Sequence, residues 1–174
     1  MADALALHGI RMIKEYLPRA VGNGGDIVAR GWMSIAACIA GAAFSNAQVG
    51  MVHALAHSIG AKFGVPHGIA NRIFLPHCIL YNLDACIDRY SQVAQAMGED
   101  IRDLEPVKAA EQAAIAIRGF SKSIGMPQTL REVNVKESGL EQCANDALMD
   151  GSIVYNPKMI FDPDEILKVY KNAF

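Results

Sequence analysis

The sequence predicts an all-α fold, a helical bundle, and three observations support this class. Apolar residues recur at three- and four-residue intervals through most of the 174 residues, which is the period of an amphipathic helix. No segment shows the alternation of a half-buried strand, and the alanine-rich run from Ala109 to Ile117 favours close helix packing. Since no internal repeat, low-complexity tract or linker divides the chain, we expect a single helical domain over residues 1–174.

The first two helices are expected within residues 3–47. Asp3 is a good N-cap for the first helix, and Pro18 is expected to close this helix or its last turn. Residues 22–25, Gly-Asn-Gly-Gly, are typical of a turn, and Asp26 is placed to cap a second helix that reaches about Ala47. The larger apolar residues of that second helix are expected to pack in the core. They are Trp32, Ile35, Cys38, Ile39 and Phe44.

A third helix is expected from Gly50 to Phe63, and the run Gly64-Val65-Pro66 is expected to break it. The fourth helix begins near Gly68 and meets Pro76, which should kink it or divide it in two. Glycine and proline then separate four further predicted helices. These cover residues 84–97, 106–124, 140–149 and 164–170.

Composition narrows the class of protein and its location. With 52% hydrophobic and 20% charged residues the chain is typical of a water-soluble globular domain, and 16 basic against 18 acidic residues give no basic field for nucleic acid. Four scattered cysteines form no CxxC pair, which fits a reduced, cytoplasmic setting. The longest apolar stretch, Trp32 to Phe44, is shorter than the roughly 20 residues that cross a bilayer, so we expect no membrane span and no secretion signal.

Four of the five histidines lie between residues 53 and 77. His53 and His57 are four positions apart, so on a helix they share one face about 6 Å apart along the axis. A glycine-proline turn could swing His67 back toward that face. Imidazole binds iron, zinc, copper and nickel, so such a cluster can hold a divalent metal, although histidines satisfied within a core have the same spacing. A zinc protease is excluded because position 54 of the would-be HExxH motif is alanine.

Several motifs together resemble the signature of the iron-containing (group III) alcohol dehydrogenases. They are Gly50-Met-Val-His-Ala-Leu-Ala-His-Ser-Ile-Gly60, Pro66-His-Gly-Ile-Ala-Asn71 and Leu75-Pro-His77, with further similarity in residues 3–7, 16–20, 40–46, 124–127 and 156–158. The similarity covers most of the chain. It implies the C-terminal helical domain of the iron-containing alcohol dehydrogenase and dehydroquinate synthase-like fold.

The resemblance also implies roles for three histidines. His53 and His67 match the family's metal-ligating histidines, and His57 matches a histidine that lies beside the substrate and the nicotinamide without ligating the metal. The implied metal is iron, with zinc as the alternative, and it would act as a Lewis acid on the oxygen of an alcohol or aldehyde while hydride passes to or from NAD or NADP. By contrast, we expect His77 to be structural and His8 to lie at the surface.

Two parts of the family's site have no match in residues 1–174. One is an Asp-x-x-x-His motif that completes the metal site, and the other is the nucleotide-binding domain with its glycine-rich loop. Residues 22–25 cannot replace that loop because no strand precedes them. We therefore expect the chain alone to bind metal weakly or not at all and to be inactive.

A second class of function stays open from the sequence, namely a non-enzymatic helical module that packs against itself or another chain. An apolar surface that a nucleotide-binding domain would cover tends to be buried by association, so we expect a homodimer or a higher oligomer. A third possibility is a partner chain that supplies the nucleotide-binding domain.

Overall fold

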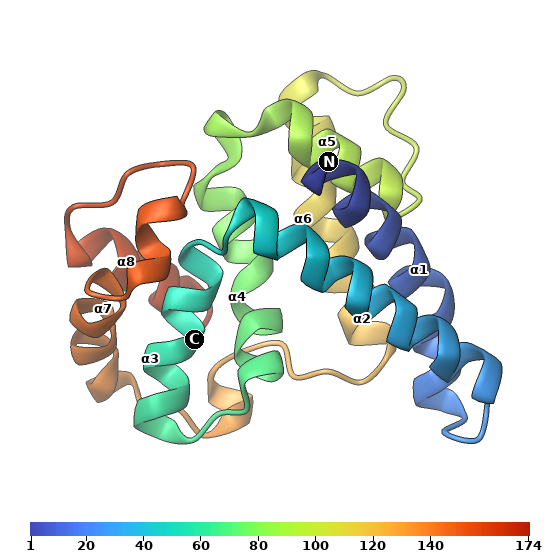
Figure 1. The fold of residues 1–174 in the computed structure, drawn as a ribbon. Helices are drawn as coiled ribbons and strands as arrows, with labels where there is room; N and C mark the ends of the chain where they lie inside the picture. Colours follow the sequence, from blue (N-terminus) through green and yellow to red (C-terminus); the bar gives the residue numbers. More distant parts are fainter. The chain divides into compact units, whose positions relative to one another are not determined.

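A computed structural model describes all residues from Met1 to Phe174, and it contains helices but no strand, so the predicted all-α class is confirmed (Figure 1). The α-helices are α1 (Ala2–Gly22), α2 (Ile27–Ala47), α3 (Met51–Phe63), α4 (His67–Tyr81), α5 (Ile87–Ala96), α6 (Pro106–Ser123), α7 (Leu140–Leu148) and α8 (Pro163–Asn172). Four short 3₁₀ helices are η1 (Leu83–Ala85), η2 (Arg131–Val133), η3 (Glu137–Gly139) and η4 (Gly151–Tyr155).

The helices belong to two compact units. Unit 1 consists of Met1–Gln48 and Ile87–Ile124, and it contains α1, α2, α5 and α6. Unit 2 consists of Val49–Cys86 and Gly125–Phe174, and it contains α3, α4, α7 and α8. The organisation of the whole chain as one domain stays a prediction.

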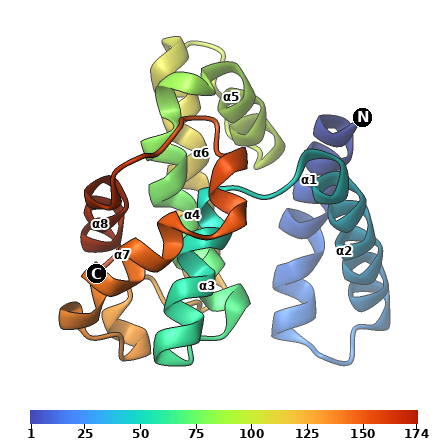
Figure 2. The ribbon, with the colours of Figure 1, turned by 60° about the vertical axis from the view of Figure 1, so that its left-hand side comes forward.

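In unit 1, α1 and α2 form an antiparallel pair (Figure 2). Asp26 caps α2 as predicted, because its Oδ1 accepts a hydrogen bond of 2.9 Å from the backbone N–H of Ala29. Small residues form the seam between the two helices. The buried residues of α2 are Ala29, Ala36 and Ala43, spaced by seven, and a Cβ built on Gly9 of α1 would lie 3.9 Å from the carbonyl oxygen of Ala36.

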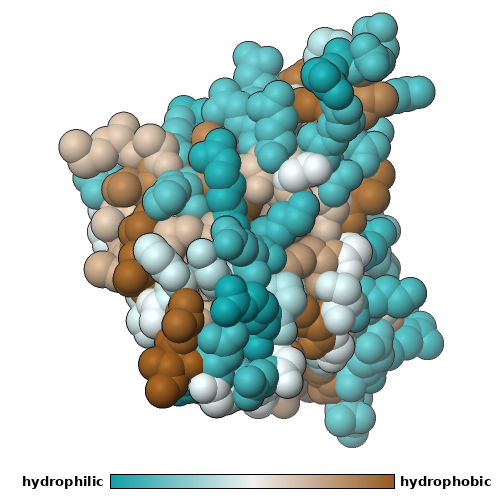
Figure 3. Space-filling model, turned by 90° about the vertical axis from the view of Figure 1, so that its right-hand side faces the viewer, coloured by the Kyte–Doolittle hydropathy of each residue, from teal (hydrophilic) through white to brown (hydrophobic).

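The predicted core role of the large α2 residues is wrong. Trp32 is 41% exposed, Ile35 46% and Phe44 54%, and Cys38 is exposed as well. The alanine stripe forms the buried seam. Trp32 stacks on Tyr16 of α1 with ring centroids 5.6 Å apart, and Ile39 is half-buried beside Gly9, so these two residues line the edge of the seam. On the face of the molecule in Figure 3, apolar side chains drawn in brown lie among hydrophilic ones drawn in teal.

By length and composition alone, α2 is also apolar enough to cross a membrane, with a mean hydropathy of 1.6 over its best window. This is weak evidence, since core helices and signal sequences share these properties. The expectation that the chain spans no membrane stays a prediction.

The predicted cap and end of the first helix are wrong. The first helix begins at Ala2 with Met1 as its N-cap, so Asp3 lies in the first turn, and it continues past Pro18 to Gly22. The fourth helix begins at His67, close to its predicted start, and it is one helix through Pro76, so only the alternative that Pro76 divides it is wrong. A proline removes one backbone hydrogen bond, but packing of the turns on both sides can keep a helix continuous.

Unit 2 holds the larger apolar core, which α3, α4, α7 and α8 build together. Phe74 of α4 and Tyr170 of α8 are fully buried, and their rings meet edge to face with centroids 5.2 Å apart. The Tyr170 hydroxyl lies 3.0 Å from the carbonyl oxygen of Leu55, to which it donates, and 2.5 Å from Ser58 Oγ. These hydrogen bonds join α8 to α3. The helix that carries His53 and His57 is therefore anchored in the core of unit 2.

Candidate functional site: a histidine cluster in unit 2

Three histidines from α3 and α4 lie close together in unit 2. The ring centroids of His53 and His57 are 6.0 Å apart, and the centroid of His67 lies 5.2 Å from each of them. The expectation that the turn between the helices returns His67 to the face of His53 and His57 is therefore confirmed. The spacing of the α3 pair follows from one helical turn between positions four apart.

The turn that brings the rings together depends on glycine. Gly64 ends α3 in the left-handed conformation, with φ of 71°. This conformation is unfavourable for a residue that has a side chain but not for glycine, and the N–H of Gly64 donates to the carbonyl oxygen of Gly60. Pro66 then precedes the first residue of α4, which is His67. His67 thus lies in the first turn of α4, at the end of a short and constrained connection.

Asp150 contacts the cluster from a distant part of the sequence, and the sequence analysis missed it. Its Oδ2 lies 2.8 Å from Nδ1 of His57, and its Oδ1 accepts a 2.7 Å hydrogen bond from the backbone N–H of Ser152 at the start of η4. The side chain of Asp150 is 22% exposed, whereas that of His57 is 46% exposed. The cluster therefore pairs a partly buried carboxylate with an exposed imidazole.

Burial and charge shift two pKa values in this cluster. Partial burial raises the pKa of Asp150, but the hydrogen bonds from Ser152 and His57 outweigh this effect and hold the pKa below its ordinary value of 3.8. Burial lowers the pKa of His53 below 6.5, the neighbouring His67 and His57 lower it further, and Asp150 partly opposes them. At neutral pH we therefore expect an ionised Asp150 and an uncharged His53.

His67 has a polar partner within its own helix. The Nδ2 of Asn71, one turn further along α4, donates to Nε2 of His67 over 2.9 Å. The Oδ1 of the same amide is buried and has no hydrogen-bond partner. A buried acceptor without a partner costs free energy, and it is a frequent mark of a place where a ligand or water binds.

The donor atoms of the cluster suit the metal that the resemblance implies. His53 and His67 offer imidazole nitrogens of the kind that iron and zinc accept, and a metal requires the uncharged form that burial favours at His53. Nevertheless, the chain has no group of three or more His, Cys, Asp or Glu side chains arranged to hold a metal ion. The residues fit part of a coordination shell.

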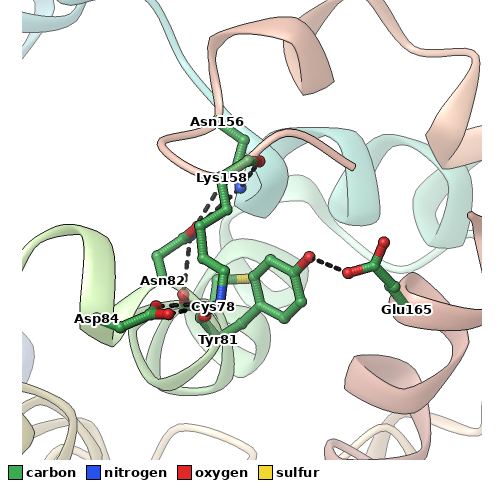
Figure 4. Close-up of polar contacts among 7 residues, drawn as sticks. All are labelled: Cys78, Tyr81, Asn82, Asp84, Asn156, Lys158 and Glu165. Atoms are coloured by element: carbon green, nitrogen blue, oxygen red, sulfur yellow. Dashed lines mark hydrogen bonds and ion pairs between the residues drawn. The ribbon is translucent and has the colours of Figure 1, made fainter. Parts of the chain in front are cut away.

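A second polar cluster joins α4 to the segment after η4, and it involves the Asn156-Pro-Lys158 motif (Figure 4). Asn82 and Asn156 exchange two hydrogen bonds through their amides, of 3.0 and 2.8 Å. Lys158 bonds the carbonyl oxygen of Tyr81 over 3.1 Å and pairs with Asp84 over 3.0 Å. The motif thus anchors the segment that follows Asp150.

The remaining histidines lie elsewhere. His77 of α4 lines a cavity of about 360 Å³ next to Tyr81, whose hydroxyl donates to Glu165 of α8 over 2.6 Å. Burial and this carboxylate raise the pKa of Tyr81. His8 is exposed on α1 in unit 1.

Comparison with known proteins identifies the family. The model of the Fe-containing alcohol dehydrogenase family, C-terminal, matches residues 1–174, so this chain belongs to that family and the resemblance seen in the motifs is confirmed. It is 41% identical over 100% of its length to the 1,3-propanediol dehydrogenase of Klebsiella pneumoniae, and 38% identical over 99% to the NAD-dependent methanol dehydrogenase of Bacillus methanolicus. In each case the match covers 45% of the relative.

Solved structures support the same family assignment. A crystal structure of a 1,3-propanediol oxidoreductase matches 99% of this chain with a TM-score of 0.95 and 42% identity, and an alcohol dehydrogenase from Oenococcus oeni does so with a TM-score of 0.95 and 34% identity. The chain spans 45% of each of these structures. The helices described above therefore have the fold of the C-terminal domain of this family.

Proposed function

We propose that this chain supplies the metal-facing part of an NAD(P)-dependent alcohol dehydrogenase site that interconverts alcohols and aldehydes. His53 and His67 would ligate the metal, and His57 would lie beside the substrate. The observation that carries the proposal is the convergence of three imidazoles, 5.2 to 6.0 Å apart, within a chain that matches the family over its whole length. The relatives named for 1,3-propanediol and methanol support a short alcohol as the substrate class.

The proposed metal is a divalent ion, iron first and zinc as the alternative, because imidazole nitrogen suits both. When bound, it would supply a Lewis acid for the alcohol oxygen. The chain's own contribution is to keep His53 uncharged through burial and to hold His67 at the start of α4, next to the other two rings. The two ligands leave further coordination positions to groups outside the cluster, so binding by residues 1–174 should be weak.

Titration calorimetry of the purified chain with Zn²⁺, and with Fe²⁺ under anaerobic conditions, tests the metal site. We expect His53→Ala and His67→Ala each to reduce the affinity by roughly tenfold or more, because each removes one of two ligands. His8→Ala is the matched control, since His8 is exposed on a helix of unit 1. Equal binding by all four proteins would overturn the assignment of His53 and His67.

We also expect residues 1–174 alone not to reduce NAD or NADP with short alcohols, even with metal added. Catalysis requires the cofactor, the metal and the alcohol to be held in near-contact geometry, and the relatives use more than twice this length. Robust turnover in a nicotinamide absorbance assay would contradict this expectation. In the family setting the nucleotide-binding part would come from a longer protein or from a partner chain.

The second candidate is a non-enzymatic helical module that associates with itself. The exposed apolar residues of α2, among them Ile27, Val28 and Phe44, favour it, since apolar surface tends to be buried by association. We expect a homodimer or a higher oligomer in light scattering at micromolar concentration, and a monodisperse monomer would count against this candidate. A cytoplasmic location and no binding of nucleic acid stay predictions.

A further inference from the structure

We infer that Asp150 is a positioning residue that holds His57 as the Nδ1–H tautomer, leaving Nε2 as the nitrogen that can accept a proton. The inference rests on the proposed place of His57 beside the substrate, and it adds a residue that the histidine motifs do not contain. The contact is long-range, since α3 supplies the imidazole and the residue before η4 supplies the carboxylate.

The hydrogen bonds of Asp150 determine which nitrogen of His57 carries the proton. An ionised carboxylate only accepts hydrogen bonds, so Nδ1 of an uncharged His57, 2.8 Å from Oδ2, has to be the donor. The other oxygen, Oδ1, is already engaged by the backbone N–H of Ser152 over 2.7 Å. Each oxygen therefore has its own partner, and the carboxylate is oriented from both sides.

The segment that follows Asp150 packs against the start of α3. A Cβ built on Gly50, the residue before α3, would lie 3.3 Å from the Cα of Asn156, which follows η4. Asn156 is in turn bonded to Asn82 of unit 2 through both amides. Because η4 is anchored at this end, Asp150 meets the first turns of α3 at a defined position, as a supporting residue of a site must.

The tautomer has a chemical consequence at the proposed site. With Nδ1 protonated, Nε2 carries a free lone pair, and it can take the hydroxyl proton of an alcohol. The O–H bond breaks, an Nε2–H bond forms, and the electron pair stays on the alcohol oxygen. The imidazolium that results is stabilised by the adjacent carboxylate of Asp150, whereas the other tautomer would present an N–H to the substrate and could not act as the acceptor.

Long-range ¹⁵N–¹H NMR of the ¹⁵N-histidine-labelled chain tests the inference in the absence of metal, at a pH well above the ordinary histidine value of about 6.5. A protonated ring nitrogen and a bare one have well separated ¹⁵N shifts, and His57→Gln identifies the signals of His57. We expect the Nδ1–H form to dominate at His57. If His57 is instead Nε2–H, the inference is wrong, whatever the metal titrations show.

Asp150→Asn sharpens the test because one carboxylate oxygen becomes an NH₂ donor. If Oδ1 keeps its bond to Ser152, the amide donates toward Nδ1 of His57 and reverses the tautomer to Nε2–H, as the equivalent change does in the serine protease triad. Asp162→Asn is the matched control, since Asp162 also caps a helix by accepting from a backbone N–H, 2.8 Å away, but at the start of α8.

The outcomes separate this inference from the proposed function. Reversal in Asp150→Asn and none in Asp162→Asn supports it, and an unchanged His57 tautomer in Asp150→Asn overturns it. If Asp150→Asn fails to fold, the tautomer of the unmodified chain decides alone. Equal metal binding by the unmodified chain and by His53→Ala and His67→Ala would refute the metal site while leaving the tautomer result intact.

Discussion

The helices α2 and α3 are both rich in apolar residues, yet they use them in opposite ways. Of the 21 residues of α2 only three are buried, and all three are alanines. Of the 13 residues of α3 six are buried, and they include Met51, Leu55 and Ile59. The comparison shows that the spacing of apolar residues predicts where a helix forms, but it does not predict which residues of the helix are buried.

The cause of the difference is the number of elements that pack on each helix within its unit. The helix α3 contacts α4, α7 and η4, so several of its sides are covered. The helix α2 packs on α1 through one stripe of small residues, where Gly9 and Ala36 allow the backbones to approach closely. A narrow seam of alanines buries little area, and hydrophobic stabilisation scales with the apolar area removed from water.

Replacing one phenylalanine in each unit by alanine tests this contrast through the free energy of unfolding. Phe74 is fully buried against Tyr170, so Phe74→Ala should lower the free energy of unfolding by about 3–5 kcal/mol through lost burial and a cavity. Phe44, at 54% exposed, is the matched control on α2, and Phe44→Ala should change stability by no more than about 0.5 kcal/mol. Guanidinium unfolding followed by circular dichroism measures both, and equal effects would remove the contrast between the two helices.

The sequence allowed the fold class and most helices to be predicted, because periodicity and caps are local signals. Asp26 caps α2 as expected, and the helix at Pro106–Ser123 lies where the pattern placed it. The errors arose where tertiary packing overrode a local sequence signal. Pro18 was expected to close a helix that continues to Gly22, Pro76 does not divide α4, and large residues of α2 such as Phe44 were expected in the core but lie exposed.

The candidate site was predictable only where its residues are close in the sequence. The four-residue spacing of His53 and His57 and the glycine-proline turn before His67 indicated a cluster, and the rings do converge. Asp150 lies 93 positions from His57, and no periodicity or cap signal links two such residues. Only the tertiary structure, with η4 packed on α3, shows that they meet.

Two glycines extend the comparison to smaller effects of opposite sign. A Cβ at Gly139 in unit 2 would overlap Cζ of Phe63 and lie 2.9 Å from Cε of Lys62, so Gly139→Ala should cost roughly 1–3 kcal/mol as the ring is displaced from the core. A Cβ at Gly9 in α1 meets its neighbours only at 3.9 Å, which is ordinary van der Waals contact. Gly9→Ala should therefore stabilise the chain by about 0.5–1 kcal/mol, because alanine loses less backbone entropy in a helix.

Thermal and guanidinium unfolding of the two alanine variants, each measured against the unmodified chain, checks these signs. Destabilisation by Gly9→Ala would mean that the α1 and α2 seam is tighter than the 3.9 Å contacts indicate. If Gly139→Ala does not lower stability, Phe63 can move without loss of packing. The core of unit 2 would then rearrange more easily near Phe63 than around Phe74.

The smallest effect concerns charge at the start of α2. The hydrogen bond from Ala29 and the pairing with Arg19 hold the pKa of Asp26 below its ordinary value of 3.8. A carboxyl whose pKa is lower in the folded state stabilises that state above the unfolded pKa, and this contribution is lost as the pH falls through the folded pKa. Asp26→Asn keeps a good cap but has no charge to lose.

The melting temperature of the unmodified chain should therefore exceed that of Asp26→Asn at neutral pH, and the two should converge as the pH falls below about 3.9. Added salt should narrow the gap at neutral pH, because Arg19 is exposed and its pairing with Asp26 is screened. A gap that persisted unchanged in acid would have to come from the shape of the cap and not from its charge.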